Sequence, residues 1–323
     1  MTTQSTEARA GPGWRQAALF AGLFLALYAA LAALAEVRVG RGAEESAFQK
    51  LLAARGAQAD WIVLGASHAL PLAYGDVPGR LAEQTGARML VLAELGAGPV
   101  YARFVARQAL RDVRPARLLY VLDPFAFQAR EWNAGRVEDR TLLRTTPLRI
   151  STARLMAGMV AREGVDPRAL ADYLAGFSKL NPPRRFATDG WQGAAAFDRV
   201  ARPSRHAVQS RIDYLYPEGS GPAQADPALE AFAALIDEAQ AAGVEVVAVR
   251  LPLPEHFRDA LPASTTVLDA ARRIMAAREV PFHDLSAELD DPALYFDTDH
   301  LNRTGVERLY VEHLRAILTA APQ

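Results

Sequence analysis

The chain has 323 residues, of which 50% are hydrophobic and 23% are charged, and its formal net charge is −1. This composition excludes a disordered or collagen-like chain, and the near-neutral charge argues against a dedicated nucleic-acid-binding protein. The chain contains no cysteine, which excludes disulfides, thiolate metal sites and cysteine nucleophiles. Its length is enough for one large α/β domain or two small ones.

An apolar segment without charged residues runs from residue 17 to residue 35. Its length matches the roughly 20 residues that cross a bilayer as a helix, and it is apolar on every face, as a helix in lipid must be. Trp14 lies at one end, where an aromatic residue of the membrane interface belongs. We expect a short cytoplasmic tail (1–15), a transmembrane anchor in the inner, cytoplasmic membrane (16–36), and a linker with a short helix (37–58).

Two other interpretations of this segment stay open. A cleaved signal peptide is the more serious one, because Ala33-Leu34-Ala35 resembles a small-residue cleavage site before Glu36. The apolar run is longer than is usual in a signal peptide, which favours an uncleaved anchor. A buried core helix is the second alternative. Both membrane interpretations place the rest of the chain outside the cytoplasm, as a single-pass membrane protein or as a protein released into the periplasm.

Residues 59–323 alternate predicted strands with predicted helices. Continuous apolar runs are typical of buried parallel strands, and five of them lie at residues 61–64, 88–93, 117–122, 244–251 and 280–284. Helical patterns lie at residues 44–55, 101–110, 227–242 and 265–278, and a last helix is expected to begin at a capping box formed by Thr304 and Glu307 and to end near Leu318. Strands separated by helices predict a parallel sheet covered by helices.

This alternation breaks down between about residues 126 and 224. Helical patterns occur there at residues 151–162 and 167–177, among many arginines. We interpret this stretch as a mainly helical insertion, or cap, between the third and fourth strands of the sheet. The alternative is a set of ordinary extra helices that play no part in substrate binding.

A serine follows the first predicted strand directly, in the segment Gly65-Ala66-Ser67-His68. Open parallel sheets bind ligands at this edge. A serine there can lie at the start of the next helix, where backbone N–H groups favour an oxyanion. The alternative is a plain helix N-cap, which is a common role of serine.

Near the C-terminus, Asp297 and His300 are three residues apart. In a turn, this spacing lets the carboxylate reach one imidazole nitrogen and leaves the other nitrogen free to act as a base. Such a base can take the proton of a serine hydroxyl, which is otherwise a poor nucleophile. The alternative is a solvated loop capped by Asn302, and Asp299 could compete with Asp297 as the partner of the histidine.

Together these segments resemble the SGNH (GDSL-like) hydrolase superfamily. The resemblance implies a flavodoxin-like, three-layer α/β/α fold with a five-stranded parallel sheet, in which Ser67 is the nucleophile, His300 the base and Asp297 the acid that orients it. The continuation from His300 through Leu-Asn to Gly305 is also typical of that superfamily.

The sequence departs from the superfamily pattern around the oxyanion site. The resemblance implies a first donor at the Ser67 N–H and a second at a glycine after the second strand, for which Gly96 and Gly98 are candidates. The third donor is usually an asparagine, but Asp123 stands at its position, and a carboxylate repels an oxyanion unless it is protonated or turned away. The site would then be slow, take a donor from elsewhere, or bind without turnover.

Two further residues are candidate substrate contacts: His68, which follows the serine, and Arg250, which lies near the end of the fourth strand. Each has a plainer alternative, packing for His68 and an ion pair for Arg250. The remaining histidines show no metal-binding spacing, so we expect no metal and no other cofactor; they are His206, His256, His283 and His313.

An anchor followed by such a domain resembles the DltD-like and alginate-O-acetylation-like branch of the superfamily. This resemblance implies an O-acyltransferase that takes an acyl group from an ester donor and passes it, through an acyl-serine, to a glycan or polyol of the cell envelope. It also implies a membrane-bound O-acyltransferase as a partner. The alternatives are an esterase or lipase with the same triad, and a non-catalytic scaffold of the envelope.

Overall fold

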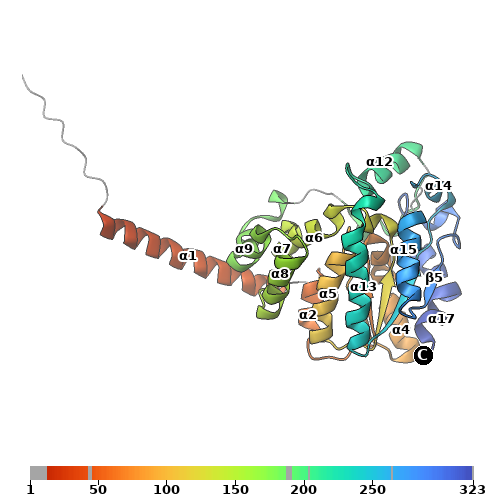
Figure 1. Ribbon diagram of the computed structural model, residues 1–323, viewed down its shortest axis with the longest axis horizontal. Helices are drawn as coiled ribbons and strands as arrows, with labels where there is room; N and C mark the ends of the chain where they lie inside the picture. Colours follow the sequence, from red (N-terminus) through yellow and green to blue (C-terminus); the bar gives the residue numbers. More distant parts are fainter. Residues whose placement is uncertain (1–12, 43–45, 187–190, 203, 263–264, 322–323) are drawn as a thin grey trace, which may run out of the picture.

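The computed structural model describes residues 13–42, 46–186, 191–202, 204–262 and 265–321 (Figure 1). Five parallel strands form one sheet in the order β2-β1-β3-β4-β5, which confirms the predicted fold class. The strands are β1 (Trp61–Leu64), β2 (Met89–Val91), β3 (Arg117–Val121), β4 (Glu245–Arg250) and β5 (Phe282–Asp284). Each lies within the apolar run that predicts it, with ends that differ by up to two residues.

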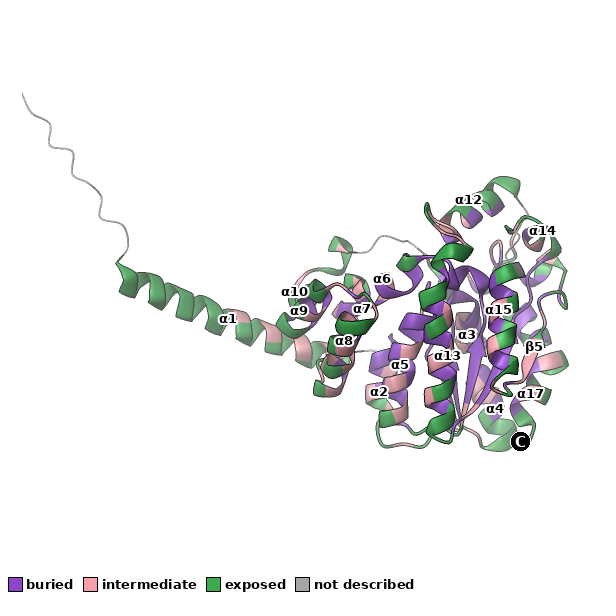
Figure 2. Ribbon diagram, viewed as in Figure 1, coloured by how far each residue is buried: buried purple, intermediate pink, exposed green. Residues whose placement is uncertain are grey.

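Alternate residues of the strands pack against opposite helix layers, because successive side chains of a strand point to opposite faces. Ile62 and Leu64 of β1 belong to one core, and Trp61 and Val63 belong to the other. The first core is closed by α2 (Ala47–Ala53), α5 (Pro99–Asp112), α13 (Asp226–Ala241) and α15 (Thr265–Ala276); the second by α3 (Leu70–Tyr74), α4 (Val77–Thr85), α16 (Arg303–Leu309) and α17 (Arg315–Thr319). Figure 2 shows the buried strands between the two layers.

The mainly helical insertion has two parts that lie in different places (Figure 1). The first part lies beside the N-terminal helix and comprises α6 (Ala134–Glu138), α7 (Arg140–Thr145), α8 (Ile150–Arg162), α9 (Pro167–Ala175) and α10 (Phe177–Leu180). The second part comprises α11 (Gly193–Ala196) and α12 (Arg205–Leu215). Val208 and Ile212 of α12 pack in one cluster with Ala66 and Phe125, which follow β1 and β3. Helix α12 therefore covers the carboxyl edge of the sheet, whereas Ala196 of α11 packs against the second core.

Helix α1 (Trp14–Arg41) is long and apolar enough to cross a membrane or to be a signal sequence, and none of its residues is buried. Its second half nevertheless contacts the insertion. The hydroxyl of Tyr28 donates to the carbonyl of Ala175 at 3.0 Å, and Lys179 pairs with Glu36. The predicted tail falls mostly outside the described residues.

The last helix begins differently from the prediction. Asn302, and not Thr304, is its N-cap, because the Asn302 side chain accepts a hydrogen bond from the Gly305 N–H at 3.0 Å and donates one to the Ala293 carbonyl at 2.8 Å. The helix is also interrupted by a π-helical turn at Tyr310–Leu314 before α17. Since the cap is tied to residue 293, it also fixes the segment that carries Asp297 and His300.

The remaining elements are short. They are α14 (Glu255–Arg258) and the 3₁₀ turns Ser67–Ala69, Pro124–Phe127, Arg130–Trp132, Pro183–Arg185, Pro222–Gln224 and Pro292–Leu294.

Gly65 allows the ends of β1 and β3 to approach each other closely. Its φ is +145°, and a Cβ at this position would lie 2.7 Å from the carbonyl oxygen of Val121. We expect Gly65→Ala to lower the free energy of unfolding by about 1–3 kcal/mol or more, since it adds a clash to a backbone conformation that is nearly restricted to glycine. Gly86→Ala is the matched control, because Gly86 has φ +75° but open space around it. Denaturant titration compares the two, and an equal loss would contradict the proposed clash.

Candidate active site

Ser67 begins a 3₁₀ turn directly after β1, and only 2% of its surface is exposed. The close approach of β1 and β3 at Gly65 fixes where this turn begins. Backbone N–H groups at the start of such a turn have no partner within the turn itself. The structure therefore holds the predicted nucleophile at the carboxyl edge of the sheet, among groups that come from four other segments of the chain.

His300 is oriented by Asp297, as the three-residue spacing predicts. The imidazole Nδ1 lies 2.9 Å from both carboxylate oxygens of Asp297, and the His300 backbone N–H donates to the same carboxylate at 2.8 Å. Nδ1–H is then the donor, and Nε2 is left as an acceptor. Burial alone would raise the pKa of Asp297, but its interaction with His300 outweighs this effect and holds the pKa below its usual value.

Aromatic rings enclose His300, which is fully buried. Phe296 stacks on its ring with centroids 5.5 Å apart, and the ring of Trp191 lies 5.2 Å away. The Trp191 indole N–H also lies 3.5 Å from Asp297 Oδ2, at the limit of a hydrogen bond. The base is thus fixed by its carboxylate partner and by its packing, and Trp191 is a contribution of the insertion.

Arg211, on α12, is a member of the site that the sequence analysis missed. Its Nη2 lies 3.4 Å from Ser67 Oγ and 3.3 Å from His300 Nε2, so it stands between the nucleophile and the base. Its Nε donates to both oxygens of Asp299, at 3.1 and 2.9 Å. The only signal in the sequence is that the insertion is rich in arginine, and this does not single out one of them.

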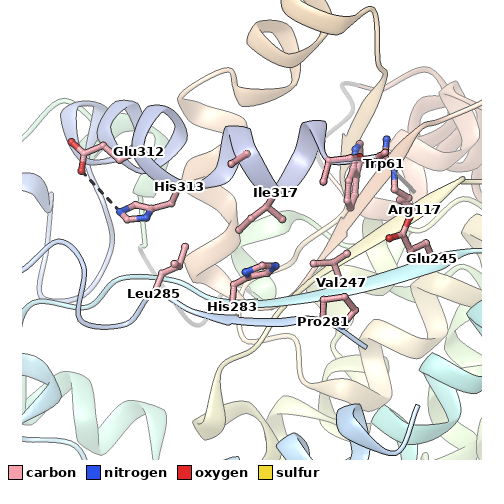
Figure 3. A pocket seen from close by; sticks show the side chains of 13 residues that line it. Trp61, Arg117, Glu245, Val247, Pro281, His283, Leu285, Glu312, His313 and Ile317 are labelled. Atoms are coloured by element: carbon pink, nitrogen blue, oxygen red, sulfur yellow. Dashed lines mark hydrogen bonds and ion pairs between the residues drawn. The ribbon is translucent and has the colours of Figure 1, made fainter. Parts of the chain in front are cut away.

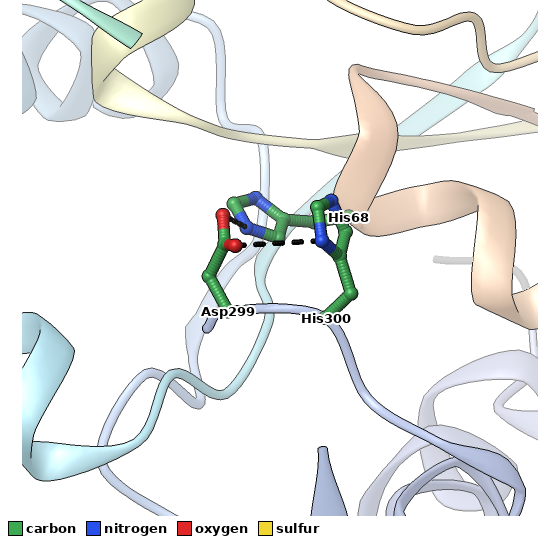
Figure 4. Close-up of side chains that lie close together, drawn as sticks. All are labelled: His68, Asp299 and His300. Carbon is green, nitrogen blue, oxygen red and sulfur yellow. Dashed lines mark hydrogen bonds and ion pairs between the residues drawn. The ribbon is translucent and has the colours of Figure 1, made fainter. Parts of the chain in front are cut away.

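His68 lies between two carboxylates (Figure 4 shows one of them). Its Nδ1 is 2.6 Å from Asp123 Oδ1, and its Nε2 is 3.0 Å from Asp299 Oδ2. Burial lowers the pKa of His68, but Asp123 and then Asp299 outweigh that effect and raise it to about 10. Both ring nitrogens are therefore protonated donors, and neither is free for the substrate contact that we predicted.

Asp123 follows β3, at the position where the resemblance implies an asparagine. Its Oδ1 accepts the hydrogen bond from His68, and its Oδ2 is buried without a hydrogen-bond partner among the described residues. The carboxylate is thus turned toward a cation, which offsets its charge. It still offers no donor to an oxyanion, since an ionised carboxylate only accepts hydrogen bonds.

Asp299 joins these groups. Only 1% of its surface is exposed, and it accepts hydrogen bonds from Arg211 and His68 while its Oδ1 lies 3.4 Å from His300 Nδ1. Burial would raise the pKa of Asp299, but Arg211 and then the two histidines outweigh it and hold the pKa well below its usual value. Asp299 does not displace Asp297, which lies closer to the base.

The other predicted residues lie around this centre. Gly96 has φ +63° and packs against the Trp132 ring. It lies two residues after Glu94, whose N–H donates to the Gly65 carbonyl and so ties this loop to the end of β1. The Gly98 N–H donates to the Trp132 carbonyl at 2.6 Å, so it is not available as an oxyanion donor. Gly96 therefore remains the better candidate for the second donor.

Arg250 lies at the end of β4, on the carboxyl edge of the sheet. Its guanidinium is 3.8 Å from the carboxylate of Asp284 at the end of β5. This contact matches the ion pair that we gave as the alternative to a substrate contact. Another cavity, lined among others by His283 and His313, is shown in Figure 3; it lies beside Trp61, at the opposite, amino end of β1.

His68, Asp299 and His300 offer three potential metal-ligand atoms within 4.8 Å of one another. The hydrogen bonds argue against a cation there. The Arg211 guanidinium already occupies both oxygens of Asp299, and His68 is held as a cation by two carboxylates. A metal ion would have to displace these positive charges, so the arrangement is better suited to holding protons.

No family model matches the chain, and no curated protein matches it in sequence. Eleven solved chains match it in structure, including two from Bacteroides species. One, from Bacteroides fragilis and provisionally named an acylhydrolase, aligns 80% of this chain with 87% of its own at 10% identity and a TM-score of 0.37. The other, a GDSL-like lipase from Bacteroides thetaiotaomicron, aligns 81% with 88% at 11% identity and a TM-score of 0.38. At these values neither informs the chemistry of the site, which rests on its own geometry.

We expect the imidazole of His68 to stay doubly protonated at pH 8, where an ordinary histidine is neutral. Since its pKa is higher in the folded than in the unfolded chain, its contribution to stability is fully present below about pH 6.5 and is lost as the pH rises toward 10. Ring-nitrogen NMR checks the protonation state. The thermal midpoint of His68→Asn should depend less on pH across this range than that of the wild type, whereas His256→Asn, outside the site, should follow the wild type.

Proposed function

We propose that this chain is an SGNH-type serine enzyme, anchored in the cytoplasmic membrane with its domain outside the cytoplasm, that transfers an acyl group from an ester donor to a hydroxyl of an envelope glycan or polyol. The observation that carries the proposal is the hydrogen bond between His300 Nδ1 and Asp297, which leaves Nε2 as an acceptor. Nε2 and Ser67 Oγ both lie within 3.4 Å of the same atom, Nη2 of Arg211. A membrane-bound O-acyltransferase as acyl supplier belongs to the same proposal.

The geometry supports a two-step reaction. Ser67 Oγ attacks the carbonyl carbon of the donor while its proton passes to His300 Nε2. When the tetrahedral adduct collapses, the bond to the leaving oxygen breaks, and that oxygen takes the proton from His300. The acceptor hydroxyl then gives its proton to His300 and attacks the carbonyl carbon of the acyl-serine. As the bond from that carbon to Ser67 Oγ breaks, Oγ takes the proton back from His300.

The burial of the site supports transfer over hydrolysis. Ser67 is 2% exposed and His300 is fully buried beneath groups of the insertion. A site closed to water protects an acyl-serine from hydrolysis until an acceptor enters. An esterase remains the second candidate, because it shares the first step and differs only in the molecule that enters next. A non-catalytic scaffold is the third candidate, since Asp123 cannot act as an oxyanion donor in its ionised form.

A serine-directed fluorophosphonate should label the purified full-length chain at Ser67, because the probe reacts only with an activated hydroxyl. We expect Ser67→Ala to lose the label. Ser286→Ala, which removes a serine two residues after the end of β5, should keep the label. Mass spectrometry of the labelled peptide provides the measurement. An unlabelled wild-type chain would favour the scaffold.

The acceptor separates the two enzymatic candidates. The full-length chain in detergent is incubated with p-nitrophenyl acetate, with and without a soluble polysaccharide acceptor. Acetate recovered on the polysaccharide supports transfer, and release of free acetate alone in both reactions supports an esterase. Ser67→Ala should abolish either product.

The state of the N-terminus tests the anchor. We expect the mature chain in the membrane fraction to keep residues 1–35, since the apolar helix is long enough to span a bilayer. Intact-mass measurement after membrane extraction checks this. A mature chain that begins at Glu36 in the soluble fraction would instead indicate a cleaved signal peptide.

A further inference from the structure

Arg211 is held beside the hydroxyl of the predicted nucleophile. Its Nη2 is within 3.4 Å of Ser67 Oγ, and its side chain is only 14% exposed. We propose that Arg211 is a catalytic residue that donates a hydrogen bond to the oxyanion of the tetrahedral adduct. This inference rests on the proposed function, because it requires Ser67 to be the nucleophile.

Among the described residues, Arg211 is the side chain that the structure places within hydrogen-bond distance of Ser67 Oγ. Asp123 stands after β3, but both of its oxygens are acceptors, and Oδ1 is already taken by His68. The remaining donors are backbone N–H groups, of which those of Ser67 and Gly96 are the candidates. A guanidinium supplies both N–H donors and a full positive charge, and it cannot lose its proton at any physiological pH.

A buried chain of alternating charges positions the guanidinium. Arg211 donates from Nε to Asp299, Asp299 accepts a further bond from His68, and His68 donates its other N–H to Asp123. Two cations and two carboxylates therefore neutralise one another within the site. Because Nε is tied to Asp299, the Nη2 end of the planar group is directed at Ser67. Asp299 and His68 are thus positioning residues, and the unusual pair of His68 and Asp123 completes the chain.

The contact between Arg211 and His300 explains when the donor becomes available. In the resting site Nη2–H donates to His300 Nε2 at 3.3 Å. When Ser67 Oγ bonds to the carbonyl carbon, the π electrons of the carbonyl move to its oxygen and the serine proton moves to Nε2. Nε2 then no longer accepts a hydrogen bond and carries positive charge, so it repels Nη2–H. The oxyanion is bonded to the carbon that Oγ has attacked, so it lies close to Nη2 and accepts that hydrogen bond instead. No proton leaves Arg211.

The test uses the full-length chain in detergent, with hydrolysis of p-nitrophenyl acetate as the readout. Arg211→Lys keeps a positive charge beside Asp299 but has no separate nitrogen to take the place of Nη2 beside Ser67. Arg211→Ala removes the guanidinium altogether. We expect kcat to fall by about 100- to 1000-fold in both, as for loss of one oxyanion donor, with KM little changed. Added guanidinium ion should restore part of the kcat of Arg211→Ala but none of that of Ser67→Ala. Arg205→Ala, an exposed position on the same helix, is the control and should keep wild-type kcat.

Other outcomes overturn the inference. Wild-type kcat with a raised KM would make Arg211 a substrate-binding group, and a raised kcat would mean that it merely blocks the base. If Arg211→Ala does not fold, as judged by its thermal midpoint, Arg211→Lys decides. Failure of the proposed function is distinguishable: there, the wild-type chain would not hydrolyse the ester, or Ser67→Ala would hydrolyse it at the wild-type rate. If Ser67→Ala is inactive and the Arg211 variants are not impaired, only the role of Arg211 is refuted.

Discussion

The site depends on the carboxylate of Asp299. It is buried, it accepts hydrogen bonds from Arg211 and His68, and it lies within 3.4 Å of the imidazole that Asp297 orients. A buried charge is tolerated only when it is paired and hydrogen-bonded. Each of the two cations here meets that condition through Asp299. Loss of this one charge would leave the buried Arg211 guanidinium without a hydrogen-bonded carboxylate and His68 with Asp123 alone.

The groups of the site come from parts of the chain that the fold brings together by different means. Ser67, His68 and Asp123 follow β1 and β3, which are neighbours in the sheet, so parallel pairing alone places them side by side. The segment with Asp297 and Asp299 is fixed by the Asn302 cap. Arg211 is carried by α12, whose apolar residues pack on Ala66 and Phe125. The insertion therefore contributes side chains to the candidate site, Trp191 and Arg211.

What could be predicted from the sequence was local or repetitive. Apolar runs between helical patterns indicate β1 to β5, and the three-residue spacing of Asp297 and His300 carries its own geometry. The Arg211 contacts join residues 88 and 144 positions apart, and no spacing or motif marks them. From the sequence, His68 was predicted to contact the substrate and Asp123 to leave the oxyanion without a donor. Their 2.6 Å contact shows instead that the two side chains pair with each other. The Thr304 cap was wrong because a tertiary hydrogen bond to residue 293 favours Asn302.

The contact of α1 with the insertion limits how the proposed anchor can sit in a bilayer. The part of α1 before Tyr28, residues 14–27, is roughly 21 Å long at 1.5 Å per residue, whereas the hydrocarbon core is about 30 Å thick. A spanning α1 would therefore carry Tyr28, and Ala175 bonded to it, down to the level of the lipid. A groove between α1 and the insertion is lined by Leu148 and Leu174, which are 46% and 54% exposed and are suited to that depth. The anchor would then fix the height of the domain above the membrane, and an acceptor would have to come within that fixed reach.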